Sequence, residues 1–398
     1  MSRSEAEKAI ESLRTGIPPV GHLRRFTVGR ASEIQRLEET LRRPNEHRGE
    51  ALLVQANYGA GKTHLLRLIR ELALDEGFAV ALVTVDSRSN VRFNRMDQVA
   101  AAVMRELEVD HSSGKGAWTL FDAFAACDPT LLNARQRDVH ERISAGGRWD
   151  MSDELKSPGL WVALRAWIHA STDATRDLVK DWLSSPWSYE STPGEMYRQL
   201  VAGLRPAVRD PRPDRTMFSE GVFHFRKHGH AQAWSVLSDL DVLSRLCGRR
   251  GLVLLFDEFE DVIQNMNNIG LEQDAFVNLF RLFSGERFGG MSYFAVTPDF
   301  AEKCRDRIYS KMLYEFPVER FNDLARFEVS PIRKRDLVGL AESIRTTHGC
   351  AYEWEAQGRY TDRELEALVE RLYRRRSADQ IRQAIQGIVV ALDERIDE

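Results

Sequence analysis

Residues 51–63 read Ala-Leu-Leu-Val-Gln-Ala-Asn-Tyr-Gly-Ala-Gly-Lys-Thr, and they carry the strongest indication of the fold. Its first five residues form an apolar run of strand length, and a helical pattern begins at Lys62. A second apolar run, from Phe78 to Asp86, follows that helix. Buried strands that flank a helix are typical of a parallel sheet. The sequence therefore predicts such a sheet, with a glycine turn after its first strand.

The glycine turn has the residues of a phosphate-binding loop. Gly59 and Gly61 let backbone N–H groups approach a phosphate at a helix N-terminus, where the helix dipole favours anions. Lys62 would place its charge between the β- and γ-phosphates, and the Thr63 hydroxyl would bind Mg²⁺. The predicted cofactors are ATP and Mg²⁺, and the predicted loop consists of Ala56, Asn57, Tyr58, Gly59, Ala60, Gly61, Lys62, Thr63 and His64. Its first position departs from the usual pattern, because alanine replaces glycine at the strand exit.

A further apolar strand, from Gly251 to Phe256, ends in two acids. Asp257 is placed to bind Mg²⁺, and Glu258 to orient or deprotonate an attacking water. A glutamate there favours hydrolysis over phosphoryl transfer to a metabolite, and we recognise no acceptor pocket for a kinase. Capping of the following helix is the alternative for these acids, and it suits Glu260 and Asp261 better than Asp257.

Other polar residues are candidates for catalytic roles. Thr297 ends the predicted strand 292–296, where it could contact the γ-phosphate or the attacking water. Arg320 and Arg326, near the start of the last predicted strand, could reach a neighbouring subunit's nucleotide, although a surface salt bridge suits either equally well. Arg374–Arg376 and Arg382 could report on the γ-phosphate or form a solvated basic face.

The order of these elements predicts an α/β fold, in which helices cover both faces of a mostly parallel sheet. We expect an N-terminal helix at 5–15 and a second from Glu33 to about Arg43, capped by Ser32. Four parts are predicted along the chain. Residues 1–107 form the N-terminal helix and the first half of the nucleotide domain, 108–231 an α-helical insertion, 232–333 the second half of the domain, and 334–398 a helical lid. The predicted lid helices are 335–347, 361–374 and 377–394.

Most of the tryptophans of the chain lie in or next to the insertion. Seven of the eight tryptophans lie from Trp118 to Trp234, and core packing is favoured over a binding surface for them. Phe223–His230 interleaves aromatic and basic residues, which suits an exposed connector, contact with nucleic acid or a partner, or a metal site through His224 and His228.

Composition excludes several classes of protein. The chain lacks an apolar run of the roughly 20 residues that a membrane helix needs, and its charged N-terminus is unlike a secretory signal. We therefore expect a cytoplasmic protein. Four cysteines without CxxC spacing argue against a zinc ribbon or disulfide framework. The net charge of -4 excludes a uniformly basic nucleic-acid binder, although a local patch could still bind phosphates.

The order of motifs resembles the AAA+ and STAND classes of P-loop ATPases. Val28, Gly29 and Arg30 precede the glycine loop, and the resemblance implies that this segment lies beside the adenine. Ala9–Pro18, Lys62–Arg67 and Glu76–Val83 narrow the resemblance to the small ATP-binding protein of bacterial BREX phage-exclusion systems. One departure lies in the last lid helix, where Ser377-Ala-Asp-Gln stands in place of the expected proline and arginine.

The resemblance implies an ATPase that regulates or loads larger defence proteins of the helicase, methyltransferase or nuclease type. Such a protein would act as a homo-oligomer or a hetero-complex, with DNA as a possible partner. One alternative is a DNA-binding ATPase of the transposition or replication-initiator type. Another is a STAND-like nucleotide switch, although the long repeat sensors typical of such switches are missing from this chain.

Overall fold

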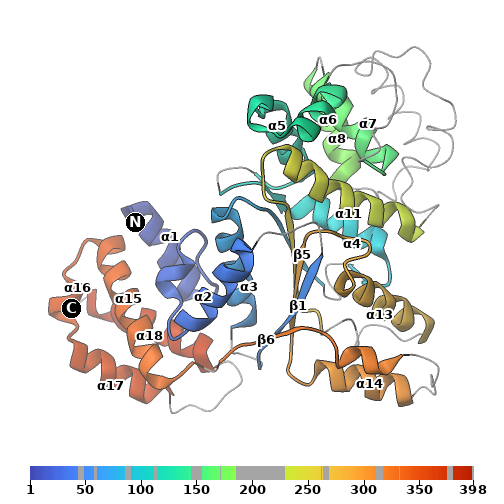
Figure 1. Cartoon of the computed structure of the whole chain (residues 1–398). Helices are drawn as coiled ribbons and strands as arrows, with labels where there is room; N and C mark the ends of the chain where they lie inside the picture. The colour runs from blue at the N-terminus through green and yellow to red at the C-terminus, as the bar shows by residue number, and fades with distance from the viewer. Residues whose placement is uncertain are drawn as a thin grey trace.

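The computed structural model describes residues 1–43, 49–57, 61–85, 91–111, 114–144, 155–170, 172–184, 229–260, 262, 269–310, 317–330, 332–373 and 380–396. Figure 1 shows a central sheet flanked by helices, with a helical unit to one side that contains both chain termini. The fold is α/β, and the predicted fold class is confirmed.

The described part of the sheet has six strands in the order β3-β2-β4-β5-β1-β6. Five of them pair in parallel: β1 (Glu50–Gln55), β2 (Ala79–Thr84), β4 (Leu252–Asp257), β5 (Met291–Val296) and β6 (Arg326–Glu328). All five lie where strands were predicted, the last of them at 326–330. The edge strand β3 (Leu107–Glu108) pairs antiparallel with β2 and was not predicted, because two residues are too few to show a strand pattern.

Two helical layers cover the sheet. On one face lie η1 (Leu23–Phe26), α2 (Ala31–Arg42) and α3 (Lys62–Asp75), whose apolar residues join Val54 of β1 in one core. On the other face lie α4 (Met96–Glu106), α11 (Gly229–Leu246), α13 (Ile269–Phe283) and α14 (Phe300–Ser310), which share a core with Leu53. Adjacent residues of a strand point to opposite faces, so β1 serves both cores.

The predicted cap of α2 is wrong. Arg30 occupies the N-cap position, without a capping bond from its side chain, and Ser32 is the second residue of the helix. The Ser32 hydroxyl donates instead to the Glu33 carboxylate at 2.8 Å. Glu33 in turn accepts a bond from the backbone N–H of Ser330 at 3.3 Å. The serine therefore helps to fix the acid that links α2 to the end of β6.

The insertion continues the core of the second face. Its described elements are α5 (Ala117–Ala126), η2 (Pro129–Leu131), α6 (Ala134–Ser144), α7 (Pro158–Ile168) and α8 (Asp173–Ser184). Trp161, Trp167, Trp182 and Trp234 are buried in the cluster that also holds Leu53. Core packing is thus confirmed for these four tryptophans, whereas Trp149 and Trp187 lie outside the described residues.

The helical unit at the side contains α15 (Lys334–Tyr352), α16 (Ala356–Arg359), α17 (Asp362–Tyr373) and α18 (Gln380–Ile396). These agree with the three predicted lid helices and add the short α16. The N-terminal helix α1 (Arg3–Arg14) shares their apolar core, so the two ends of the sequence form one unit, called the lid below (Figure 1).

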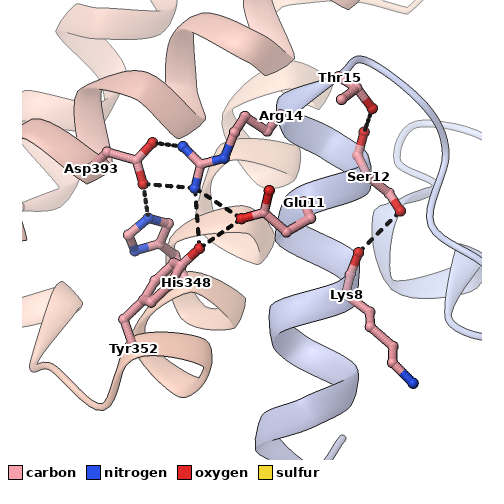
Figure 2. Close-up of polar contacts among 8 residues, drawn as sticks. All are labelled: Lys8, Glu11, Ser12, Arg14, Thr15, His348, Tyr352 and Asp393. Atoms are coloured by element: carbon pink, nitrogen blue, oxygen red, sulfur yellow. Dashed lines mark hydrogen bonds and ion pairs between the residues drawn. The ribbon is translucent and has the colours of Figure 1, made fainter.

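A polar network joins α1 to the rest of the lid (Figure 2). Arg14 of α1 binds both oxygens of the Asp393 carboxylate and donates to the Tyr352 hydroxyl at 3.1 Å. His348 bonds to the same carboxylate at 3.0 Å. Burial alone would raise the pKa of Asp393, but the bonds from Arg14 and His348 hold it below its usual value. The network fixes the position of α1 on the lid.

Candidate functional site

The predicted site residues gather at the carboxyl edge of the sheet. β5 lies between β1 and β4, and all three strands run in parallel. Asp257 ends β4, Thr297 follows β5 and the glycine loop follows β1. Ligands of open α/β sheets bind at this edge, where loops leave the strands.

The end of the glycine loop forms the start of α3. Gly61 is the N-cap residue, with a φ of 87° that favours glycine. Lys62 and Thr63 are the first helical residues, so backbone N–H groups of the first turn are available to an anion. Ala56 lies at the strand exit, where its N–H bonds the carbonyl of Val296 at 3.1 Å. Tyr58, Gly59 and Ala60 lie outside the described residues.

Lys62 is paired with a different acid from those that we expected to share the site. Its ammonium forms a buried ion pair with Glu260. The Glu260 carboxylate thus pairs with Lys62, while Asp261, the other acid considered as a helix cap, lies outside the described residues. The sequence held no local signal for this pair, because the two residues are 198 positions apart.

The two predicted acids occupy different environments. Asp257 is buried, and one of its carboxylate oxygens accepts the backbone N–H of Glu258 at 3.0 Å. Glu258 is partly exposed and has a φ of 54°, in the left-handed region that few non-glycine residues adopt. The chain thus turns sharply at the strand end and brings Glu258 to the wall of a cavity, described next. Strained residues of this kind gather at functional sites.

A cavity of about 360 Å³ lies between the sheet edge and the lid. Its polar end is formed by Gly61, Lys62, Thr63 and Glu258. Its apolar wall comes from three sources: residues 17–19 after α1, Phe26 and Val28 around η1, and lid residues including Leu340 and Ile385. A mostly apolar cavity with a few polar groups at one end is typical of a small-molecule site. It suits a ligand with a flat apolar base and an anionic tail.

The Val28-Gly29-Arg30 segment is positioned by the lid and by β6. Val28 and Arg30 line the cavity, whereas Gly29 packs against Asp336 of α15. An added Cβ at Gly29, which has a φ of 68°, would lie 2.4 Å from the Asp336 Cγ. Arg30 donates to the carbonyl of Ser330 at 3.1 Å. Its burial lowers the pKa of Arg30, and the charges of Glu33 and Asp336 oppose that shift.

His64 lines the same cavity as a neutral ring. Burial, with the charges of Arg30 and Arg67, lowers the pKa of His64 to about 4. Its Nε2 lies 2.7 Å from the Thr27 hydroxyl, which donates its own proton to the carbonyl of Leu23. Nε2 must therefore donate, which leaves Nδ1 as an acceptor.

Two residues of α3 fix the segment that follows α1. Arg67 donates to the carbonyl of Pro18 at 3.1 Å, and the Glu71 carboxylate accepts the backbone N–H groups of Gly21 at 2.7 Å and Leu23 at 3.1 Å. We did not predict a role for Arg67, which lines the cavity and faces the charge of Asp257. The signal was its spacing, since Thr63 and Arg67 lie one turn apart on one face of α3.

The lid contributes a cation. Arg382 of α18 lines the cavity, and its role toward a bound phosphate stays a prediction. The other candidates on the lid, Arg374–Arg376, lie outside the described residues.

Thr297 is close to this site but not in the cavity wall. Its hydroxyl is buried and faces the Asp299 carboxylate, without reaching normal hydrogen-bond geometry to any group in the described part of the chain. A buried hydroxyl without a partner is costly, so it is available to a ligand or a water.

Arg320 and Arg326 lie away from the cavity. Arg320 stacks over the Phe280 ring at 4.5 Å and lines a hollow with Glu50 at the amino end of β1. Arg326, at the start of β6, donates to the carbonyl of Phe321 at 3.2 Å. Neither therefore serves the cavity of its own chain, and their roles toward a neighbouring subunit stay predictions.

No group of three or more His, Cys, Asp or Glu side chains with the arrangement of a metal centre occurs among the residues that the structure describes. The possible metal pair His224 and His228 lies outside those residues. Within the same ranges, the chain forms no helix of the length and apolarity that a membrane crossing requires.

Comparison with known proteins found a match to one family model. Residues 1–144 match the family model described as BREX system ATP-binding protein BrxC/D. The matched stretch contains α1, the Val28–Arg30 segment and the glycine loop. The resemblance expected from the sequence is thereby confirmed. No curated protein and no solved structure matches the chain.

Proposed function

We propose that this chain, a BREX-system ATP-binding protein by the match of its first 144 residues, hydrolyses ATP to regulate or load larger components of an anti-phage system. One observation carries the enzymatic part of the proposal. A single cavity brings the start of α3, with Lys62 and Thr63, together with the strained Glu258.

Different parts of the cavity would bind the base and the phosphates of ATP. The apolar wall would take the adenine, with Val28 and Arg30 beside it. The phosphates would lie against the first turn of α3, where backbone N–H groups and the Lys62 ammonium offset their charge. Because the lid forms part of the wall, a bound nucleotide would join the lid to the sheet.

The residues present fit a bound Mg²⁺. Thr63 offers a hydroxyl oxygen and Asp257 a carboxylate oxygen, the hard ligands that this ion prefers. Mg²⁺ would neutralise charge on the phosphate oxygens.

Hydrolysis would depend on Glu258 and Thr297. Glu258 would orient the attacking water and accept its proton, since it is the partly exposed acid in the cavity wall. The unpartnered Thr297 hydroxyl would bond the γ-phosphate or that water. Arg382 would approach the phosphates from the lid, and Arg320 or Arg326 would act on a neighbouring subunit.

The biological part of the proposal rests on the family match. Membership of a multi-protein system implies partner proteins, and we propose a helicase, methyltransferase or nuclease among them, with DNA as their common substrate. We expect the chain to act in the cytoplasm, where ATP and invading DNA meet, as an oligomer or in a hetero-complex.

The Glu258→Gln variant tests the enzymatic proposal. It should bind ATP within about threefold of the wild-type affinity but lose about 100-fold or more in kcat, since a general base contributes that much. Phosphate release and ATP binding would be measured in parallel, with Lys62→Ala as the variant that should bind poorly. Wild-type turnover by Glu258→Gln would remove Glu258 from this role.

The same assay, repeated with duplex DNA, single-stranded DNA and RNA while particle mass is followed, tests the biological part. Stimulation by DNA together with ATP-dependent assembly would support a loading role. Slow turnover by a monomer that nucleic acid does not stimulate would favour a nucleotide switch that acts within a complex.

A further inference from the structure

We propose that Glu260 is a positioning residue that holds Lys62 before a nucleotide binds and thereby weakens nucleotide binding. This inference rests on the proposed ATP site. It concerns how that site is regulated before ATP arrives, and it assigns a role to an acid that neither motif of the site includes.

The first step is the geometry of the pair. Lys62 and Glu260 are only 8% and 4% exposed, and the Glu260 Oε1 forms the ion pair with the Lys62 ammonium. The second carboxylate oxygen, Oε2, is buried and has no hydrogen-bond partner in the described part of the chain. Glu260 therefore has one strong contact, and it is to the residue that must bind phosphate.

The second step is the anchoring of Glu260. Phe259 directly precedes it and packs against two other aromatic rings. The distance between ring centroids is 4.8 Å to Phe93 and 4.7 Å to Phe294. The backbone N–H of Phe259 also bonds the carbonyl of Ala295 at 3.3 Å. These contacts hold the turn after β4 in place, so Glu260 cannot follow Lys62 into the cavity without disturbing a packed aromatic core.

The third step is electrostatic. A buried charge is stable only beside a partner, so Glu260 stabilises the Lys62 ammonium in the absence of a nucleotide. A bound triphosphate would take over the Lys62 ammonium and leave the anchored carboxylate without its main partner. The cost of that loss must be subtracted from the affinity for ATP. Glu260 therefore acts as a competitor for the phosphate.

Removal of the charge should then tighten binding. Glu260→Gln keeps the size and the acceptor oxygen, and it should bind ATP and ADP about tenfold more tightly than the wild type, because an uncharged group holds Lys62 less strongly. Glu260→Asp keeps the charge and should stay within about threefold of the wild type. Titration with each nucleotide, with turnover measured separately, checks both values.

The matched control is Glu258→Gln. It also removes one negative charge from the same turn, but Glu258 is placed to act on water rather than on Lys62. Its nucleotide affinity should stay near the wild-type value while its kcat collapses. An equal gain in affinity in both variants would show a general charge effect and would overturn the role of Glu260.

Folding must be checked in each variant by circular dichroism and thermal melting. For a variant of reduced stability, the rise in Tm on addition of ATP compares its ATP affinity with that of the wild type. This rise should be larger for Glu260→Gln than for the wild type. A folded Glu260→Gln that binds no more tightly, or shows a smaller rise, refutes the inference. If the wild type itself bound no ATP, the proposed function would fail instead.

Discussion

Gly16 and Arg382 lie in direct contact where α1 ends and the cavity beside the lid begins. A Cβ added to Gly16 would lie 2.5 Å from the Arg382 Cγ, and Gly16 has a φ of 73°. Both residues line the cavity. The stem of the lid arginine thus crosses the backbone of the segment that forms the apolar wall, and only a residue without a side chain leaves room for it.

Removal of the Arg382 side chain should impair turnover. Arg382→Ala should lower kcat about 100-fold, because a charged donor aimed at a developing negative charge contributes this much. Arg395→Ala is the matched control, since Arg395 lies on the same helix but contacts Arg359 and Glu364 instead. Steady-state phosphate release measures both. Turnover by Arg382→Ala at the wild-type rate would place Arg382 outside the catalytic site.

A side chain at Gly16 should weaken nucleotide binding as well as stability. Gly16→Ala introduces strain of roughly 1 kcal/mol at a positive φ, and it also pushes Arg382 away. Gly77→Ala provides the control, because Gly77 has a φ of 80° but no atom within 4 Å of an added Cβ. Thermal melting should show a loss in both variants, and ATP titration a loss only in Gly16→Ala. Equal ATP affinities in the two variants would contradict this account.

The His348 ring should make the lid sensitive to acid. The Trp354 N–H, which can only donate, bonds the His348 Nδ1 at 2.9 Å, so the proton of the neutral ring lies on Nε2 and faces Asp393. Burial lowers the pKa of His348, although Asp393 opposes the shift. Because the folded pKa lies below the unfolded value of about 6.5, the contribution of His348 to stability is complete above that pH and is lost as the pH falls below it.

Trp354→Phe should reduce this sensitivity. The variant keeps an aromatic ring but frees Nδ1 to take a second proton, so the difference in Tm between pH 7.5 and pH 5.5 should be smaller than in the wild type. Thermal melting monitored by circular dichroism measures this difference. The same difference in both proteins would mean that the bond from Trp354 does not control protonation of His348.

Local patterns were sufficient for most elements and for the residues at the start of α3 and the end of β4. The apolar runs at 51–55 and 251–256 could be assigned to strands because a buried parallel strand is apolar at every position. Lys62, Thr63 and Glu258 could be assigned to one site because parallel strands end at the same edge of a sheet. The cap of α2 failed, because a serine next to a helix start leaves the capping residue undetermined within one or two positions.

Contacts between distant parts of the chain could not be predicted. Helix α1 was assigned to the nucleotide domain by its position in the sequence, but its apolar face joins α15 and α18 in the lid core. The ion pair between Glu260 and Lys62 was not predicted, because the two residues lie on different elements. In both cases the local sequence cannot show which distant residues a side chain will contact.

Strand pattern, helix pattern and glycine turns depend on neighbouring residues, so the α/β class, the glycine loop before α3 and the pair of acids after β4 could be predicted from the sequence. The three-dimensional arrangement was needed to show that α1 and the lid form the apolar wall of the cavity, that Arg382 crosses Gly16, and that Glu260 pairs with Lys62. These relations depend on how packed elements meet in space. Many arrangements share the same local pattern, and the burial of apolar faces selects among them.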